Sequence, residues 1–376
     1  MKVSEGGRVG LRTDVFIVGG GPVGLAAAIA TRMKGFEVLV ADGVKPPIDK
    51  ACGEGLMPDT IKALGALGVE VCDADGRAFR GIRFIDGKSK VDASFPSGHG
   101  IGVRRTALHQ KLVKRATDCG VSMLWNTPVT GICAVGAAVK GGMVRAKWII
   151  GADGSNSRVR KWVGLEAHRE HKRRFVLRRH FQLKPWTDCM EVYWGQDVQA
   201  YVTAVAGQEV CVVIISREPG VPMDTALREF PELASRLDGA EPASTDRGAV
   251  TAMHSLKRVC HGRVALIGDA SGEVDAITGD GLCLGFRQAG ALAEALREDN
   301  LQTYNAAHRR LAWRPRLMGR VLLALDGRPA LRKRVLRTLS GEPDIFRRLL
   351  AVHVGEASPR HLAATGALLG WRFLAA

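Results

Sequence analysis

The sequence lacks any pair of cysteines close enough to form a zinc or redox motif. Its eight cysteines are spread along the chain, and the two closest, Cys119 and Cys133, are fourteen positions apart. This spacing excludes a CxxC motif. Scattered cysteines are typical of proteins from a reducing compartment, so we expect a cytoplasmic protein that contains neither structural disulfides nor a metal site.

Long apolar runs are also missing. Residues 1–12 are polar and lack the apolar centre of a signal peptide. No segment approaches the roughly 20 apolar residues that span a bilayer, because the apolar segment 362–376 is short and contains Arg372. The sequence therefore predicts a soluble protein that is peripheral to a membrane at most.

Aromatic residues are scarce, at 6% of the chain, and no helix-turn-helix, RNA-recognition or zinc-finger pattern is present. Nucleic acid is therefore not an expected partner. The 54 Lys and Arg residues nevertheless exceed the 38 Asp and Glu residues, which gives a net charge of +16. Such a balance also suits anionic small molecules or an anionic membrane surface. Nothing in the sequence specifies an oligomeric state.

The composition is that of a globular protein, with 46% hydrophobic and 24% charged residues over 376 positions. That length predicts two or three structural units. The first unit opens with an apolar run at 14–18, an Ala-rich helix at 22–34 and a second strand at 37–40. Strand, helix and strand in this order form a βαβ unit, which indicates an α/β fold.

A glycine motif joins the first strand to the helix. Gly19, Gly21 and Gly24 match GxGxxG, and Pro22 stands at the first helical position. In this motif the first glycine allows the tight turn, the second lets a pyrophosphate approach the backbone, and the third lets helix and strand pack closely. The helix N-terminus then offers free N–H groups to the phosphates.

An acidic residue completes the dinucleotide pattern. Asp42 stands eighteen residues after Gly24, at the end of the second predicted strand. A carboxylate at that place accepts hydrogen bonds from ribose hydroxyls. The pattern therefore predicts a dinucleotide site, with a glycine-rich turn in another kind of α/β protein as the alternative.

Three further segments carry a resemblance to a known family. Gly-Ala-Asp-Gly at 151–154 and Gly-Asp-Ala at 268–270 each follow an apolar strand, and Thr-Gly-Asp-Gly-Leu at 278–282 opens a long helix. Together with the glycine motif, they resemble the superfamily of flavoprotein monooxygenases (p-hydroxybenzoate hydroxylase-like) and geranylgeranyl reductases, over about residues 13–300. The resemblance implies non-covalently bound FAD in a Rossmann-like domain of the glutathione reductase type.

The resemblance also implies which residues contact FAD. Asp269 resembles the aspartate that accepts a hydrogen bond from the ribityl chain. Gly279, Gly281 and Leu282 resemble the turn whose backbone N–H groups face the flavin pyrimidine, where they stabilise negative charge on the reduced ring. Val129 resembles the strand residue that contacts adenine.

Two charged residues have alternatives. Arg105 resembles the arginine near the FAD phosphates, and Arg104 is the competing choice. Asp153 resembles an aspartate linked to pyridine nucleotide use, but an aspartate in a turn after a strand is as often a turn former. Because no second GxGxxG is present, we expect NAD(P)H to act only as a transient electron donor.

The loop around Cys52 and Gly53 resembles the Cys-Gly loop of geranylgeranyl reductase-like proteins, which lies close to the flavin ring. Cys52 is therefore the candidate catalytic residue, as a substrate contact or a proton donor, and a packing thiol is the alternative. The reductase signature Tyr-x-Trp-x-Phe-Pro keeps only its tyrosine, Tyr201, and the halogenase tryptophan motif is absent.

We expect three regions along the chain. A discontinuous FAD-binding domain takes 13–75, 98–165 and 258–305, and a substrate domain built on an antiparallel sheet takes 76–97 and 166–257. A helical, basic C-terminal tail takes 306–376. Its arginines alternate with apolar residues, so the tail is expected either to contact an anionic membrane surface or to pack as a helical cap.

Three functions are compatible with these motifs and with the family resemblance. The first is an NAD(P)H-dependent monooxygenase that acts on an apolar or aromatic small molecule. The second is a reductase of a C=C bond in a prenyl lipid or quinone. The third is a catalytically degenerate flavin-binding accessory protein. The sequence identifies neither the substrate nor a catalytic acid–base pair.

Overall fold

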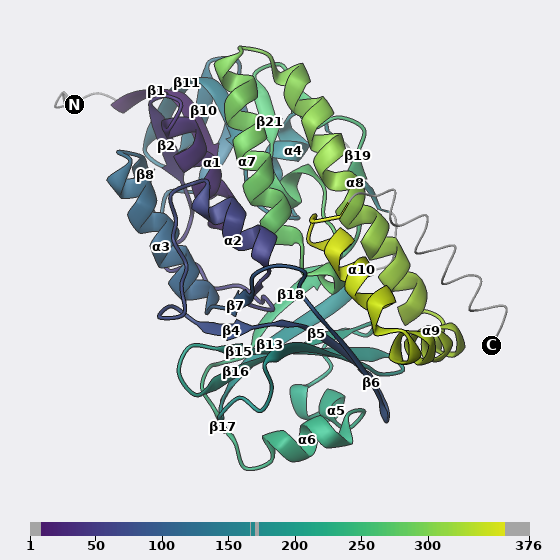
Figure 1. Ribbon diagram of the computed structural model, residues 1–376. Coiled ribbons are helices and arrows are strands. Elements are labelled where there is room, and N and C mark those ends of the chain that lie inside the picture. Colours follow the sequence, from purple (N-terminus) through teal and green to yellow (C-terminus); the bar gives the residue numbers. More distant parts are fainter. Residues whose placement is uncertain (1–8, 166, 170–172, 358–376) are drawn as a thin grey trace.

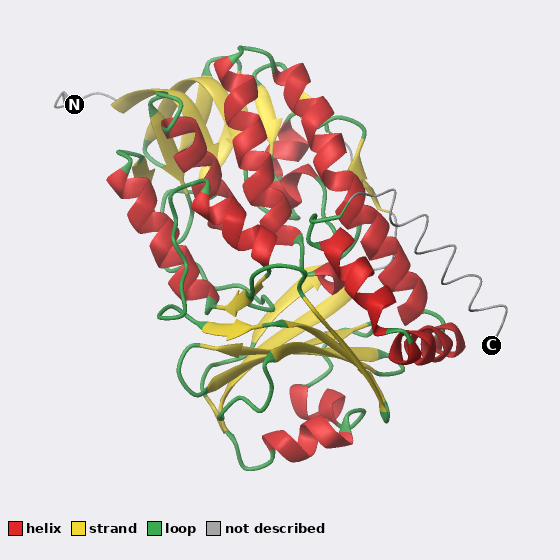
Figure 2. Cartoon of the chain, viewed as in Figure 1, coloured by secondary structure: helices red, strands yellow, loops and turns green. Residues whose placement is uncertain are grey.

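Two sheets form the framework of the protein. The computed structural model describes residues 9–165, 167–169 and 173–357. Figure 1 and Figure 2 show an upper lobe, in which helices flank a sheet, and a lower sheet with two short helices beneath it. Helices from the C-terminal part of the chain lie along one side of both lobes (Figure 1). The fold is thus a mixed α/β architecture, as the sequence predicts.

The upper sheet has a parallel centre. Its main path runs in the order β20 (Cys260–His261), β21 (Val264–Leu266), β11 (Gly142–Gly151), β1 (Val9–Val18), β2 (Val38–Ala41) and β8 (Ser122–Leu124), and β10 (Gly136–Val139) and β9 (Val129–Cys133) branch from β11. The strands from β21 to β8 run parallel. Parallel strands are buried on both faces, which explains why the apolar run of β1 is continuous rather than alternating.

Helices cover this sheet. They are α1 (Pro22–Arg32), α2 (Pro58–Gly65), α3 (Arg105–Asp118), α4 (Arg158–Trp162) and α7 (Gly281–Arg297). Helix α1 begins at Pro22, whose fixed φ suits the first helical position, and it packs against α3 and α7. The predicted helices at 22–34 and after Gly281 are therefore confirmed.

The lower sheet is mostly antiparallel. Its order is β17 (Glu241–Pro242), β13 (Arg174–Gln182), β16 (Glu209–Ser216), β15 (Val198–Val205), β14 (Cys189–Trp194), β5 (Gly81–Asp86) and β6 (Ser89–Ser94), with β18 (Arg247–Thr251) beside β13. Only β14 and β5 pair in parallel. All of these strands lie within 76–97 and 166–257, although the division of the chain into domains itself stays a prediction.

The strand-like pattern of residues 189–216 predicts one hairpin that turns near Gly207, and this prediction is right about that turn but wrong about the number of strands. The segment forms three strands, because a tight turn closes earlier, where the Gly195 N–H donates to the Val198 carbonyl at 2.9 Å. The second turn, near Gly207, lies where the sequence placed it.

The sequence pattern of residues 225–237 predicts one helix, and this prediction is wrong. The segment contains two helices, α5 (Met223–Leu227) and α6 (Pro231–Leu237). Pro231 has no N–H to continue a helix, and its ring disfavours the helical conformation of Phe230 before it. Phe230 accordingly has φ −125° and ψ 71°.

The two faces of the lower sheet carry different partners. Helices α5 and α6 pack on one face, around buried residues such as Val212 and Leu233. The other face packs against two helices of the C-terminal region, α9 (Pro329–Gly341) and α10 (Pro343–His353). A third helix, α8 (Leu301–Asp326), packs along α7.

The apolar side chains of α9 and α10 face the protein. Leu336, Leu339 and Phe346 are buried in the same cluster as Ile82 and Val91 of the sheet. This part of the basic tail therefore packs as a helical cap, and residues 358–376 lie outside the described residues. Within the part that the structure describes, no helix is both long and apolar enough to cross a membrane.

Short elements link the two lobes. They are the sheet of β3 (Gly55–Leu56), β7 (Gly100–Gly102) and β4 (Arg77–Phe79), the pair β12 (Ala167–Arg169) and β19 (His254–Leu256), and the 3₁₀ turns η1 (Gly268–Ser271) and η2 (Ala276–Thr278). The turns η1 and η2 lie between β21 and α7, where the family resemblance places the flavin.

Candidate functional site

A cavity of about 560 Å³ is lined by residues from both lobes. Every predicted site residue except Gly24 lines it, and these residues are Gly19, Gly21, Pro22, Asp42, Cys52, Gly53, Arg105, Val129, Asp153, Asp269, Gly279, Gly281 and Leu282. The chain thus brings together segments that are more than 250 residues apart in the sequence, from Gly19 to Leu282. Whether each residue has its predicted role stays a prediction.

The glycine turn has the geometry that the motif requires. Gly19 has φ +109°, and a Cβ there would lie 2.4 Å from the Ala152 oxygen. A Cβ at Gly24 would lie 1.9 Å from the Gly19 oxygen, so Gly24 serves close packing rather than the cavity. A Cβ at Gly21 would meet nothing within 4 Å, which leaves room for a ligand beside the uncapped N-terminus of α1.

Asp42 and His109 hold this turn from two sides. Asp42 accepts hydrogen bonds from the N–H groups of Gly20 at 2.7 Å and Val44 at 2.9 Å. His109 is fully buried, and its Nε2 lies 2.8 Å from the Gly20 oxygen. Because that oxygen can only accept, Nε2 carries the proton, and burial lowers the pKa of His109. His109 was missed by the sequence analysis, since it lies among the apolar positions of α3.

The two competing arginines have different surroundings. Arg104 donates from Nε and Nη2 to Glu209, at 2.9 and 2.7 Å, and does not line the cavity. Arg105 lines the cavity, and its buried Nε has no hydrogen-bond partner among the described residues. An unpaired buried donor is costly, so Arg105 is the arginine with a free donor for an anionic ligand.

Asp153 is engaged in local structure. Its carboxylate accepts hydrogen bonds from the Ser157 hydroxyl at 2.5 Å and from the N–H groups of Arg158 and Val159 at 2.7 and 3.1 Å. These bonds satisfy the first turn of α4. The turn-forming alternative therefore describes its contacts, and a role toward a nucleotide stays a prediction.

Asp269 lies on the cavity wall beside two ionisable groups. Its Oδ2 is 3.6 Å from the Lys50 ammonium. Glu273 lies nearby, and burial, followed by the Asp269 charge, raises the pKa of Glu273 to about 8. This raised pKa favours the neutral form of the Glu273 carboxyl group at neutral pH, and the sequence did not reveal this cavity residue.

The turn that precedes α7 is anchored to the lower sheet. Asp275 forms a buried ion pair with Arg174 and caps the Ile277 N–H at 3.0 Å. The Tyr201 hydroxyl donates to the Ile277 carbonyl at 3.1 Å. Gly279 has φ +68°, a left-handed conformation that favours glycine. Tyr201, the remnant of the reductase signature, thus positions this turn.

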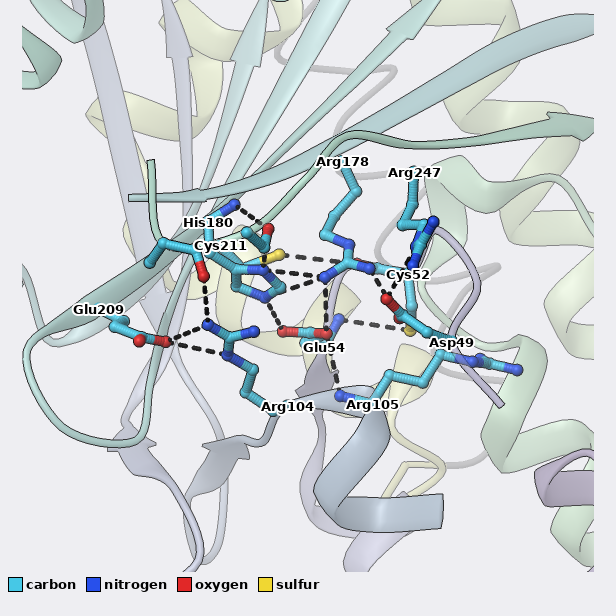
Figure 3. A network of polar contacts seen from close by, with 12 residues as sticks. Asp49, Cys52, Glu54, Arg104, Arg105, Arg178, His180, Glu209, Cys211 and Arg247 are labelled. Carbon is cyan, nitrogen blue, oxygen red and sulfur yellow. Dashed lines mark hydrogen bonds and ion pairs between the residues drawn. The ribbon is translucent and has the colours of Figure 1, made fainter. Parts of the chain in front are cut away.

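Glu54 connects the Cys52 loop to the rest of the site (Figure 3). Its buried carboxylate accepts from the His180 Nε2 at 2.6 Å and from the Arg105 N–H at 2.9 Å. Its own N–H points to the Cys52 sulfur at 3.4 Å. Glu54 has φ +58°, a conformation that non-glycine residues rarely adopt unless their surroundings fix it.

The His180 side of this network fixes the tautomer of the His180 ring. The Arg178 guanidinium, which can only donate, lies 2.9 Å from the His180 Nδ1, so Nδ1 accepts and the proton stays on Nε2. Arg178 is almost fully buried and also pairs with Asp49 at 2.7 Å. Glu54, His180 and Cys211 are placed as a set of metal ligands could be. The positive charge of the Arg178 guanidinium, 2.9 Å from the His180 Nδ1, opposes a metal cation there.

Sequence reasoning missed Glu54, Arg178 and His180. Only their positions in the sequence could have pointed to them. Glu54 directly follows Cys52 and Gly53 of the predicted loop, and Arg178 and His180 are two residues apart, so they lie on the same face of β13.

One wall of the cavity is apolar. The lower sheet contributes the side chains of Val176, Met190, Val213 and Ile215, and Ala249 adds a further apolar group. Tyr201 stands among them with its hydroxyl already bonded. An apolar ligand group fits this wall, because it would leave no polar group unpaired.

Comparisons with known proteins show which family the chain resembles. The model of the FAD binding domain family matches residues 12–315. Menaquinone reductase of Mycobacterium tuberculosis is 29% identical over 319 residues, which are 77% of each chain. Digeranylgeranylglycerophospholipid reductase of Methanothrix thermoacetophila is 26% identical over 305 residues, 75% of this chain and 77% of the relative.

Among solved structures, a flavoprotein/dehydrogenase from Cytophaga hutchinsonii has a similar fold. Its TM-score is 0.79 at 21% identity, over 91% of this chain and 93% of that one.

Proposed function

Because the chain belongs to the FAD binding domain family, we propose that this FAD-dependent oxidoreductase reduces a carbon–carbon double bond in the prenyl part of a lipid or quinone. The observation that carries the proposal is a single cavity that contains the predicted FAD residues, the Cys52 thiol and an apolar wall. The relatives named as reductases of menaquinone and of a geranylgeranyl lipid support the same choice. The sequence analysis ranked this activity second, after monooxygenation.

The described residues fit FAD. The open space at Gly21 and the free Nε of Arg105 suit the pyrophosphate, and Asp42 lies at the end of β2, where a carboxylate accepts ribose hydroxyls. We assign the adenine to the neighbourhood of Val129, and the ribityl chain to Asp269.

The flavin ring would then lie against the turn of Gly279, Gly281 and Leu282. All three residues line the cavity. The N-terminus of α7 and the backbone N–H groups of this turn favour negative charge.

Reduction of a C=C bond requires a hydride for one carbon and a proton for the other. FAD, when bound and reduced, supplies the hydride. We assign the proton to the Cys52 thiol, because the Glu54 N–H lies 3.4 Å from its sulfur and stabilises the thiolate that remains. Proton uptake from solvent then restores the thiol.

The other residues hold and shield the reactants. The Glu54–His180 hydrogen bond fixes the loop that carries Cys52, and the apolar wall excludes water from the double bond. NAD(P)H as the transient electron donor remains part of the proposal.

The test is product identity. The protein, NADPH or NADH, and a menaquinone with an unsaturated prenyl chain are incubated in air, and the quinone is analysed by mass spectrometry together with oxygen uptake. A product that gains two hydrogens supports the reductase. A product that gains one oxygen, with matching oxygen uptake, contradicts it and supports the monooxygenase.

The variant Cys52→Ala tests the assigned proton donor. We expect turnover to fall at least tenfold while FAD binding is retained, because removal of a positioned acid typically costs a factor of 10² or more. Cys133→Ala is the matched control, since Cys133 is exposed. Full turnover by Cys52→Ala would leave Cys52 as a packing residue.

We further propose a peripheral membrane contact, which would suit a lipid substrate. On α8, Trp313 and Val321 are 50% and 46% exposed, and Arg309 and Arg310 are exposed on the same side as Trp313. Exposed aromatic and basic side chains together favour an anionic interface. We expect sedimentation with phosphatidylglycerol vesicles, reduced in Trp313→Ser. Equal sedimentation of both proteins would contradict this surface.

A further inference from the structure

The C-terminal helix α10 contacts the turn assigned to the flavin. Its last residue, His353, places Nε2 3.1 Å from the Thr278 carbonyl oxygen and Nδ1 3.6 Å from Oδ2 of Asp280. Both side chains are buried, with relative exposures of 6% for His353 and 2% for Asp280. A residue near the end of the described chain thus touches the turn between η2 and α7.

The hydrogen-bond partners of the His353 ring determine which of its nitrogens carries a hydrogen. The Thr278 carbonyl can only accept, so Nε2 of His353 carries a hydrogen. Nδ1 of His353 and Oδ2 of Asp280 have no hydrogen-bond partner among the described residues. Without a further proton, two acceptors would face each other in a buried place, which is costly.

The pair therefore holds one additional proton. It is shared as a carboxylic acid beside a neutral imidazole or as a carboxylate beside an imidazolium, and either form has no net charge. Burial, the largest influence, raises the pKa of Asp280 to about 6, which agrees with a proton that the pair retains up to about that pH.

Other charged groups surround Asp280. Asp59 of α2 pairs with Arg314 of α8 at 3.5 Å and accepts from the Cys283 thiol at 3.2 Å. The charge of Arg287 of α7 lowers the pKa of Asp280. The charges of Asp59 and Arg314 offset each other, although Oδ1 of Asp59 and Nε of Arg314 also lack a hydrogen-bond partner among the described residues.

The pair lies behind the turn rather than in the cavity. Gly279 and Gly281 line the cavity, but Asp280 and His353 do not. We propose that His353 is a positioning residue of the cofactor site, which holds the Thr278 carbonyl and, with Asp280, keeps one proton behind this turn. The proposal rests on the placement of FAD given above.

Loss of that proton would leave a negative charge behind the turn. This charge opposes the negative charge on reduced flavin. The midpoint potential of bound FAD should therefore fall more steeply with pH in the native protein than in Asp280→Asn, in which the site stays neutral. His261→Gln is the matched control, because His261 is exposed.

The experiment uses three variants of the full chain. FAD dissociation constants and midpoint potentials are measured between pH 5.5 and 8.5 for His353→Ala, His353→Gln and Asp280→Asn. We expect at least tenfold weaker FAD binding in His353→Ala and recovery of most of it in His353→Gln, whose amide can still donate to Thr278. Equal binding by both His353 variants would overturn the positioning role, and identical potential–pH curves for native protein and Asp280→Asn would overturn the shared proton.

A measurement without FAD separates this proposal from the placement of the cofactor. The pH dependence of the thermal midpoint is recorded for the cofactor-free native protein and for Asp280→Asn. We expect the native midpoint to fall relative to the variant as pH rises through about 6. Parallel curves would overturn the shared proton even if FAD binds as proposed, and a native protein that never binds FAD would instead overturn the cofactor site.

Discussion

Removal of the Glu54 carboxylate should destabilise the protein. The carboxylate accepts two hydrogen bonds, at 2.6 Å from His180 and 2.9 Å from the Arg105 N–H. A hydrogen bond to a charged group contributes about 1.5–3 kcal/mol, so Glu54→Ala should lower the free energy of unfolding by about 3–6 kcal/mol. Arg178 keeps its bond to Asp49, which prevents a larger loss.

Two related variants separate the loss of the hydrogen-bond acceptors from the backbone strain at residue 54. Glu54→Gln keeps the shape and one acceptor, but it places an amide N–H against a donor, so its loss should be about 2 kcal/mol. Glu54→Gly should be about 1 kcal/mol more stable than Glu54→Ala, because the backbone has φ +58° and glycine adopts that conformation without strain.

The assay is urea unfolding of the cofactor-free protein, followed by tryptophan fluorescence at 25 °C. Glu241→Ala is the control, since Glu241 is exposed on β17. A free energy of unfolding for Glu54→Ala within about 0.5 kcal/mol of the control value, the range of ordinary surface substitutions, would show that the Glu54 carboxylate does not stabilise the fold. FAD binding should weaken in parallel, because the same carboxylate holds the Arg105 backbone.

Three more variants test other parts of the structure. Gly24→Ala should lose both stability, by about 1–3 kcal/mol, and bound flavin, because its Cβ would lie 1.9 Å from the Gly19 oxygen; denaturant unfolding and flavin absorbance measure the two losses. Arg332→Ala should cost about 3–5 kcal/mol in the same unfolding assay, since it leaves the buried Asp86 carboxylate, now 2.9 Å from Arg332, unpaired. Glu273 has a raised pKa, so it contributes stability that is fully present below pH 4.5 and lost as pH rises through about 8; relative to Glu273→Gln, the native protein should lose about 4 kcal/mol between pH 5 and 8. A constant difference between these two proteins over that range would contradict the assignment.

The parts of the site that depend on local sequence could be predicted. A turn that needs glycine at 19, 21 and 24 is encoded by a few adjacent residues. The position of Asp42 follows because parallel strands end at the same edge of a sheet. Gly19, Gly21 and Asp42 line the cavity because strand and helix patterns fix where each turn must be.

The parts that depend on contacts between distant segments could not be predicted. Glu54 meets His180 across 126 positions of sequence, and His353 meets Thr278 across 75. No hydrophobic periodicity in the sequence predicts such pairs. The break before Pro231 was available in the sequence but was outweighed by the helical pattern around it. The basic tail was ambiguous, because an amphipathic helix has the same pattern whether it covers a sheet or a membrane.

A single turnover without oxygen tests directly whether the reduced flavin reduces the prenyl double bond. The purified protein with bound FAD is reduced by one equivalent of dithionite without oxygen, the prenylated quinone is added, and the visible spectrum is followed. We expect the oxidised flavin band to return in the absence of oxygen, at a rate that Cys52→Ala slows, while the prenyl chain gains two hydrogens. A band that returns only when air is admitted would contradict the proposed reductase activity.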